Sequence, residues 1–320
     1  MKKTILITGA TGYLGGRIAK SLSKNNSYFL RLTSTGNKIK SLRGLKNSEN
    51  IVLNLLAKGK FDKICSGVKV IIHLAAMNSH DCEDDPVKAV LVNTVGTLRL
   101  LEAARRQKVK KFIYFSTAHV YGRPLTGKIT ESLPTKPAHP YSITHRAAED
   151  FVLSENDPNG LSGTVIRLSN AVGTPIDPGV NCWSLIANVL CRQAAATNKL
   201  VLETAGLQSR DFISIENVYQ ALAHILSLPD DAIRGQIFNL GSGKSMRIID
   251  LAKLIQGRCK RILGSTPEIK TPDSPSGKEL QRLDYRIDKI KSTGFKPIDS
   301  LTKEIDNTLI FCQRNFSNRP

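Results

Sequence analysis

Three glycines near the start of the chain have the spacing that lets a backbone hold a phosphate group. Gly9, Gly12 and Gly15 follow the apolar residues 5–7 and open a segment with apolar side chains at helical spacing. The first glycine permits a tight turn, the second a close approach of the ligand, and the third close packing of a helix on a strand. The first N–H groups of that helix also favour an anion. We therefore predict a turn that binds the pyrophosphate of a dinucleotide, with contacts from Gly9, Thr11, Gly12, Tyr13, Leu14 and Gly15.

A second group of polar side chains lies farther along the chain. Ser116 and Thr117 end an apolar run, and Tyr141 and His145 follow Pro140 on a predicted helix. Residues four apart share one face of a helix, so Tyr141 and His145 can reach the same site.

The elements that must position these residues alternate between strand and helix. The expected strands are apolar runs without period-two alternation, which is typical of strands buried on both faces. This order predicts an α/β fold with a Rossmann-like doubly wound parallel sheet, whose ligand lies at the carboxyl ends of the strands. The expected strands span residues 28–33, 51–54, 68–76 and 111–116, and a long helix is expected over residues 86–107.

The segment after the second expected strand bears on the choice of cofactor. An NAD-binding fold usually places an acid about 20 residues after the glycines, on the ribose 2′-hydroxyl. Here no acid precedes Glu49, which favours NADP over NAD, although lysines in a loop are also commonly solvated. Thr33 and Ser34 are expected to contact the cofactor, and the residues that can accommodate a 2′-phosphate are Arg31, Thr33, Ser34, Thr35, Lys38, Lys40 and Arg43.

Composition narrows the classes of partner. The 320 residues carry a formal net charge of +19, but the basic residues are dispersed, which favours an acidic small molecule and a basic surface over nucleic acid. The six cysteines lack metal-ligand spacing, so buried thiols are expected rather than a metal site or disulfides. No run approaches the roughly 20 apolar residues of a membrane span, and the apolar start is too short for a signal peptide. We therefore expect a cytoplasmic protein that does not enter a membrane.

The order of the motifs resembles that of a known family. TGATGYLG at residues 8–15 is followed by IIHLAA at 71–76, Asn93, FSTAHVYG at 115–122 and PYSITH at 140–145. This order is similar to the extended short-chain dehydrogenase/reductase family, in particular to its NAD(P)-dependent nucleotide-sugar epimerases, dehydratases and reductases. The likeness extends over essentially the whole chain.

The resemblance implies a hydride-transfer site. Tyr141 matches the family's acid/base tyrosine, and Ser116 or Thr117 matches the hydroxyl that binds the substrate oxygen. His145 stands where the family has a lysine that lowers the tyrosine pKa and binds the nicotinamide ribose. Histidine titrates near pH 6.5 and is shorter, so three alternatives stay open: slower catalysis, chemistry with another base, or cofactor binding without turnover. The resemblance also implies cofactor contacts from Tyr141 and His145, and from Asn54, Leu55, Leu74, Ala75, Ala76 and Asn93.

Three residues are candidates for substrate binding. Asn170 and Arg210 match family positions that contact the sugar and the diphosphate of a nucleotide sugar, although Arg210 can instead pair with Asp211. His119 is either a proton donor or a structural residue. Family members that eliminate water carry an Asp-Glu pair where this chain has Ala118 and His119, so dehydration by that route is not expected.

The expected organisation is an NAD(P)-binding domain over residues 1–170, with a returning segment near 212–240, and a smaller α/β substrate domain over 171–320. The expected activity is epimerisation or ketone reduction of a nucleotide-activated sugar. The alternative is a non-catalytic dinucleotide-binding sensor or scaffold. By analogy with relatives, a homodimer is expected through helices at residues 86–107 and 141–153.

Overall fold

The computed structural model describes residues 2–36, 42, 44–57, 59–272 and 282–317, and the chain falls into two compact units. Unit 1 comprises Met1–Arg123, Glu131–Leu168 and Ala223–Phe238. Unit 2 comprises Pro124–Thr130, Ser169–Leu222 and Asn239–Pro320. The chain therefore passes between the units several times.

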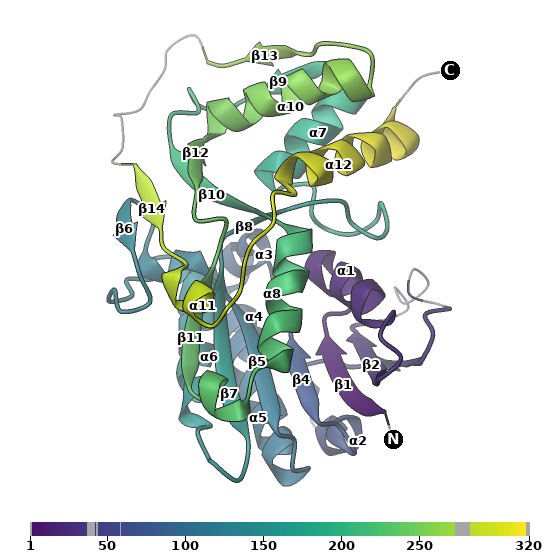
Figure 1. The fold of residues 1–320 in the computed structure, drawn as a ribbon, viewed down its shortest axis with the longest axis vertical. Coiled ribbons are helices and arrows are strands. Elements are labelled where there is room, and N and C mark those ends of the chain that lie inside the picture. Colours follow the sequence, from purple (N-terminus) through teal and green to yellow (C-terminus); the bar gives the residue numbers. More distant parts are fainter. Residues whose placement is uncertain (1, 37–41, 43, 58, 273–281, 318–320) are drawn as a thin grey trace. The chain divides into compact units, whose positions relative to one another are not determined.

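Unit 1 is built on a seven-stranded sheet, which confirms the expected fold class (Figure 1). The strand order β11-β7-β5-β4-β1-β2-β3 reverses direction between β1 and β4, the switch point where ligands bind in such sheets. The pairs from β3 across to β7 are parallel. The strands are β1 (Lys3–Thr8), β2 (Tyr28–Ser34), β3 (Ser48–Val52), β4 (Val70–His73), β5 (Lys111–Thr117), β7 (Ser162–Leu168) and β11 (Gln236–Leu240).

Helices connect these strands, and the long helix expected over residues 86–107 is divided into three segments. They are α4 (Pro86–Ala89), a π-helical segment at Val90–Val95, and α5 (Gly96–Arg106). Helical periodicity does not distinguish a π turn from an α turn, and single π turns are common at functional sites. The other helical segments of unit 1 are α1 (Tyr13–Leu22), α2 (Phe61–Cys65), α3 (Ser79–Asp84), the 3-10 turn Ala118–Tyr121, α6 (Pro140–Ser154) and α9 (Asp230–Ile233).

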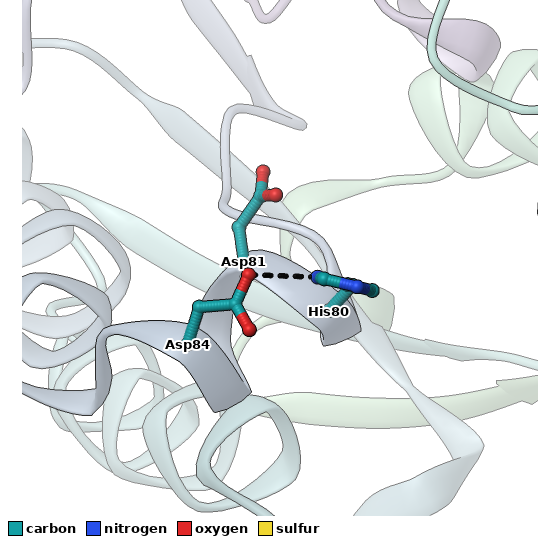
Figure 2. Close-up of side chains that lie close together, drawn as sticks. All are labelled: His80, Asp81 and Asp84. Atoms are coloured by element: carbon teal, nitrogen blue, oxygen red, sulfur yellow. Dashed lines mark ion pairs between the residues drawn. The ribbon is translucent and has the colours of Figure 1, made fainter.

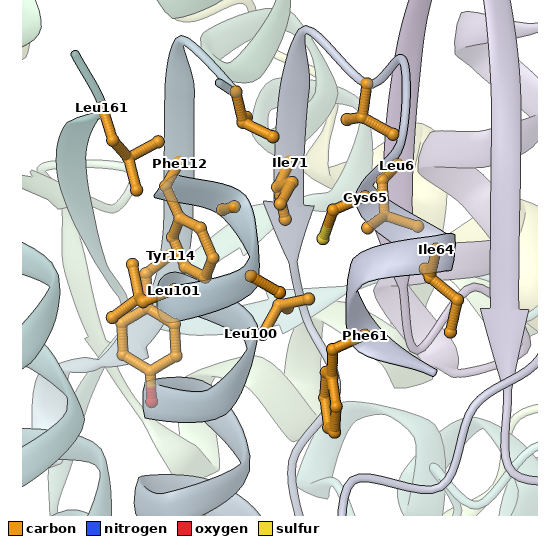
Figure 3. Packing of buried hydrophobic residues seen from close by; sticks show 14 of the residues in the cluster. Leu6, Phe61, Ile64, Cys65, Ile71, Leu100, Leu101, Phe112, Tyr114 and Leu161 are labelled. Carbon is orange, nitrogen blue, oxygen red and sulfur yellow. The ribbon is translucent and has the colours of Figure 1, made fainter. Parts of the chain in front are cut away.

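The core of unit 1 explains why β5 reads as one apolar run. All seven residues of β5 are buried, as expected for a strand covered on both faces. Phe112 and Tyr114 pack against Leu100 and Leu101 of α5 (Figure 3). The Tyr114 ring belongs to this apolar cluster, but its hydroxyl points away from Phe112 and Leu161 and needs a polar partner.

Unit 2 has smaller sheets and its own core. The core brings Val172, Leu190, Phe212, Leu251 and Leu309 together, so it is built from segments that are far apart in the sequence. The strands form the sheets β12-β10-β8 (Ser245–Arg247, Ser209–Ser214, Asn170–Val172), β13-β9 (Glu268–Lys270, Lys199–Val201) and β14-β6 (Leu283–Tyr285, Gly127–Ile129). The helices are α7 (Ile186–Thr197), α8 (Ile215–Ser227, which continues into unit 1), α10 (Ile248–Ile262), α11 (Asp288–Ser292) and α12 (Leu301–Phe316).

The six cysteines are all buried and free, as the sequence predicts. Burial raises their pKa, to about 12 for Cys65, so these thiols are unreactive at neutral pH. Within the described part of the chain, no helix is long and apolar enough to cross a membrane.

Candidate active site

The turn after β1 has the shape of a phosphate cradle. Gly9 adopts φ +67°, and a Cβ there would lie 2.9 Å from the backbone nitrogen of Ala75. A Cβ on Gly15 would lie 2.1 Å from the carbonyl oxygen of Gly9, so only glycine fits. Gly12 caps α1 without a side-chain hydrogen bond, which leaves N–H groups at the helix start for a ligand. These residues fit the pyrophosphate of a dinucleotide.

A buried hydrogen-bond chain links β1 and β4 at the switch point, and the sequence motifs did not predict it. Thr8 Oγ1 lies 2.6 Å from His73 Nδ1, and His73 Nε2 lies 2.8 Å from Thr97 Oγ1. Thr8 Oγ1 also accepts two backbone N–H groups, from Leu74 and Ala75, so its own proton goes to Nδ1. The Thr97 hydroxyl donates to a backbone carbonyl 2.6 Å away, so it accepts from Nε2. His73 is therefore the neutral Nε2–H tautomer.

The expected cofactor contact Asn93 lies in the π-helical segment, and its side-chain amide is hydrogen-bonded to other groups of the protein. Its Oδ1 accepts from the backbone N–H of Met77 at 2.8 Å, and its Nδ2 donates to Thr144 Oγ1 at 3.0 Å. Asn93 thus joins the loop after β4 to α6. The structure places it as a residue that holds the site together.

The carboxyl end of β5 separates the two hydroxyls that the sequence leaves as alternatives. Ser116 Oγ donates to Glu149 Oε1 at 2.5 Å, and Glu149 is itself paired with buried Arg167 at 2.7 Å. Thr117 Oγ1 instead accepts from the backbone N–H of His119 at 3.2 Å, and its hydroxyl acts on Tyr141 by lowering the pKa of that phenol. Thr117 is therefore the hydroxyl beside the candidate acid/base, whereas Ser116 belongs to a buried ion-pair network.

Tyr141 and His145 lie together on α6, as their spacing predicts. Their rings meet edge to face with centroids 4.5 Å apart. His139 caps the start of this helix: its Nδ1 accepts from the Tyr141 N–H at 3.2 Å in a capping box with Ser142. His145 Nδ1 lies 2.7 Å from the hydroxyl of Tyr114, while its Nε2 is buried without a hydrogen-bond partner among the described residues.

Both groups are neutral in this surrounding. Burial raises the pKa of Tyr141 to about 12, against a lowering by the Thr117 hydrogen bond, and burial lowers the pKa of His145 to about 4. Arg146 does not replace the family's lysine, because its guanidinium binds Thr135 and Asp150. Tyr141 is therefore a protonated phenol at neutral pH.

The contacts of Arg31, in the middle of β2, argue against its expected role in binding a 2′-phosphate. Arg31 Nε donates to Glu49 at 2.6 Å, and its NH1 donates to the carbonyls of Ile64 and Ser66 at 2.6 and 2.8 Å. The Arg31 guanidinium is thus hydrogen-bonded to other groups of the protein. Thr33 and Ser34 are buried at the strand end, and Lys38, Lys40 and Arg43 lie outside the described residues.

The remaining expected cofactor residues lie at strand ends of unit 1. Asn54 is exposed and accepts from the Leu56 N–H at 2.9 Å, and Leu55 packs on Gly96, where a Cβ would lie 2.8 Å from the Leu55 Cβ. Residues 74–76 follow β4, and the first two are held by Thr8 as described above. Their backbone therefore has a fixed position.

In unit 2, Asn170 and Arg210 lie on the paired strands β8 and β10. Asn170 Nδ2 donates to the Asp211 carbonyl at 2.9 Å, and Arg210 NH2 lies 3.5 Å from Gln208 Oε1. The Asp211 carboxylate accepts from the hydroxyls of Ser169 and Ser242 at 2.6 and 2.8 Å. Asp211 therefore orders the start of β10.

An exposed cluster on α3 also brings potential metal ligands together. Ligand atoms of His80, Asp81 and Asp84 all lie within 4.8 Å of one another (Figure 2). His80 Nδ1 pairs with Asp84 at 2.8 Å, an exposed i,i+4 ion pair of the kind that contributes little to stability. Asn78 caps this helix by accepting from the Asp81 N–H.

A glycine turn at the switch point of a parallel sheet defines a Rossmann-type dinucleotide-binding protein. The family model described as "NAD dependent epimerase/dehydratase family" matches residues 5–241, and the chain belongs to this family of enzymes. The resemblance stated from the motifs is thereby confirmed.

Curated relatives match at full length. A putative UDP-glucose 4-epimerase of Methanocaldococcus jannaschii is 27% identical over 316 residues, covering 97% of this chain and 99% of the relative. The dTDP-D-glucose 4,6-dehydratase of Mus musculus is 27% identical over 331 residues, covering 99% and 90%. Relatives of similar identity thus carry different reactions in their names.

Solved structures share the fold. The UDP-glucuronic acid 4-epimerase of Bacillus cereus, in complex with UDP-glucuronic acid and NAD, has a TM-score of 0.82 at 23% identity, covering 97% of this chain and 99% of that chain. The UDP-N-acetylglucosamine 4-epimerase of Methanobrevibacter ruminantium has a TM-score of 0.81 at 23% identity, covering 98% and 100%. The NAD-type cofactor expected from the glycine turn agrees with the family, whereas the preference for NADP finds no support in these comparisons.

Proposed function

We propose that the protein epimerises a nucleotide-activated sugar, using NAD held by unit 1. The observation that carries this proposal is the buried Tyr141 phenol on α6, whose pKa is lowered by the neighbouring hydroxyl of Thr117 at the carboxyl end of β5. That strand lies two places from β1 and its glycine turn, with β4 between them. Neighbouring strands are about 4.8 Å apart, so a dinucleotide on the turn spans the distance to Tyr141.

The chemistry needs one proton and one hydride. When bound, the oxidised cofactor supplies a positively charged hydride acceptor. The phenolate form of Tyr141 takes the proton from a sugar hydroxyl, and Thr117 donates to the same oxygen and orients it. With NAD bound, the hydride from the same carbon would pass to the cofactor and return to the other face of the ketone, while Tyr141 returns the proton, so atoms and electrons would balance within one turnover. Ketone reduction uses the same residues but consumes reduced cofactor.

The reaction is not expected to include loss of water. Elimination needs a separate acid and base, and the two residues after Thr117 are Ala118, which is buried, and His119, which is partly buried. Ala118 has no proton to transfer. This distinguishes the proposal from the dehydratases among the relatives.

We assign NAD rather than NADP on the position of Arg31. Its guanidinium is paired with Glu49 and two carbonyls, so it is not available to a 2′-phosphate. The sequence-based preference for NADP depended on the absence of an acid before Glu49 and on polar and basic residues of this segment, of which Arg31 is bound by protein groups and Lys38, Lys40 and Arg43 lie outside the described residues. Comparing the dissociation constants of NAD and NADP tests the assignment, which tighter binding of NADP would reverse.

We further propose that residues 1–170, with the returning segment, bind the dinucleotide and that residues 171–320 supply the sugar contacts. Asn170 keeps its side-chain carbonyl for a sugar hydroxyl, since only its Nδ2 is used by Asp211. Arg210 has the planar fork that suits a diphosphate. Replacing Arg210 by Lys keeps the charge but not the fork, and should raise KM more than it lowers kcat.

A homodimer through α4, the π-helical segment and α6 remains part of the proposal. These helices of unit 1 expose large apolar side chains, which a second copy can cover. Light scattering on the purified protein tests this, with a monomer at all concentrations as the contrary result. The exposed residues are Val87, Val90, Leu91, Ile143 and Phe151.

The deciding experiment is mass spectrometry of ligand released from native protein, followed by assay of a panel of nucleotide sugars. Retained NAD and conversion of one sugar to its epimer, without net change in cofactor, support the epimerase. Net loss of reduced cofactor supports the ketoreductase. A bound dinucleotide without turnover of any sugar supports the non-catalytic sensor or scaffold.

A further inference from the structure

His145 is buried with one ring nitrogen bound and the other without a partner. The residue is 3% exposed, its Nδ1 lies 2.7 Å from the Tyr114 hydroxyl, and its Nε2 has no partner among the described residues. A buried polar atom without a hydrogen bond is costly and rare in folded proteins. The arrangement needs a ligand atom or a water to complete it.

Tyr114 decides which nitrogen of His145 carries the proton. In the part of the chain that the structure describes, its hydroxyl has His145 Nδ1 as its hydrogen-bond partner and lies in an apolar cluster. If Nδ1–H donated instead, the phenol proton would be buried without an acceptor. A phenol is also the better acid and an imidazole nitrogen the better base, so O–H to Nδ1 is the stronger bond. Donation from Tyr114 leaves the proton of the neutral ring on Nε2.

Among the described residues, the titratable groups that face His145 include no cation that would stand in for the lysine of the family. Tyr141 lies beside it on α6, Tyr114 faces it from β5, and His73 faces Tyr114 from β4. Glu149 and Cys82 act on Tyr114 from farther away. The His145 ring therefore stays neutral and offers one N–H donor over the pH range of ordinary biochemical experiments.

We propose that Tyr114 is a positioning residue that fixes His145 as its Nε2–H tautomer, and that this N–H donates to a hydroxyl of the bound dinucleotide. The second part rests on the proposed cofactor site, whereas the tautomer does not. Lysine would bring a charge and three mobile donors to this position. The Tyr114–His145 pair instead brings one neutral donor with a fixed direction.

The first test is heteronuclear NMR of protein labelled with nitrogen-15 in its histidine rings. The His145 signals are those lost in His145→Gln. We expect a protonated Nε2 and an unprotonated Nδ1 from pH 5.5 to 9. His73 is an internal control, since Thr8 and Thr97 fix it in the same tautomer by other bonds. In Tyr114→Phe the His145 signals should shift toward tautomer exchange, whereas those of His73 stay. A protonated Nδ1 in the wild type overturns the proposal.

The second test is the dissociation constant of NAD, measured by calorimetry without substrate. Loss of one neutral hydrogen bond costs about 2- to 10-fold in affinity, so Tyr114→Phe should weaken NAD binding by that factor. In the His145→Met background, Tyr114→Phe should have no further effect. An equal loss in both backgrounds would show a merely structural role and reject the positioning. If the wild type binds no NAD while the tautomer is as expected, the proposed function fails and the Tyr114–His145 assignment stands.

Discussion

The ring of Tyr141 meets the ring of His145 edge to face, with 4.5 Å between centroids, and no cation stands between them in the described structure. A phenol in this setting has its pKa raised to about 12, with burial as the main cause. The group that the family uses as acid/base is thus held in its acid form. The raised pKa of Tyr141 determines how the rate is expected to depend on pH.

We expect kcat/KM for the oxidation step to rise with pH. Only the phenolate of Tyr141 accepts the proton, and its fraction increases about 10-fold per pH unit below the pKa. The rate should therefore still increase between pH 7 and 9, measured as kcat/KM in buffers of constant ionic strength. A plateau beginning near pH 7 would show that the free enzyme already holds an activated base.

Replacing His145 by Lys should shift this profile to lower pH. A cation within about 4–6 Å lowers a tyrosine pKa by 1–3 units, so the rate at pH 7 should rise about 10-fold or more if the variant folds. His145→Met is the matched control, because it has similar length and no charge. Equal rates for the two variants, with unchanged thermal midpoints, would contradict a role for charge at this position.

The two buried histidines make the fold sensitive to acid. Burial lowers the pKa of His73 to about 3 and of His145 to about 4, below the value of about 6.5 in the unfolded chain. The unfolded state therefore binds more protons below pH 6.5. As the pH falls below about 6.5, each histidine should lower the free energy of unfolding by about 1.4 kcal/mol per pH unit. This loss continues to about pH 4 for His145 and to about pH 3 for His73.

Urea unfolding at pH 7.5 and pH 5 measures this effect. For His145→Gln the loss of stability between the two pH values should be smaller than in the wild type by about 2 kcal/mol. Identical losses would mean that His145 is protonated in the folded protein.

The glycine turn can be tested against a second glycine in the same chain. Gly15→Ala places a Cβ 2.1 Å from the Gly9 carbonyl oxygen, so it should abolish measurable NAD binding and destabilise the fold by about 1–3 kcal/mol. Gly257 lies on the exposed side of α10, where a new Cβ has nothing within 4 Å, so Gly257→Ala should stabilise the fold by about 0.5–1 kcal/mol. NAD binding that survives Gly15→Ala would place the pyrophosphate elsewhere.

The strands of unit 1 were predictable because their physical signal is local. The apolar run 111–116 became β5 over Lys111–Thr117, since a strand buried on both faces must be apolar throughout. The glycine spacing likewise predicted the turn, because the steric constraint lies within a few residues. The β14–β6 pair was missed, since Leu283–Tyr285 and Gly127–Ile129 are far apart in the sequence.

The site residues that the motifs missed depend on contacts between distant segments. Tyr114 reads as one more apolar residue of a strand, and its partner His145 lies 31 residues later. Arg31 reads as a ligand of the cofactor, but the parallel register of β2 and β3 places it opposite Glu49. Single motifs carry no information on such pairs, and a polar residue within an apolar run is the signal that would have drawn attention to Tyr114 and His73.

The central claim is that Tyr141 is the acid/base of a nucleotide-sugar epimerase. The most direct measurement is the turnover of the accepted nucleotide sugar by Tyr141→Phe, which removes one oxygen, with NAD affinity measured on the same sample. We predict that turnover falls by about 100-fold or more, the range of general acid–base catalysis, while NAD affinity falls by less than about 10-fold, the most that loss of one neutral hydrogen bond costs. Turnover within about threefold of the wild type would contradict the account.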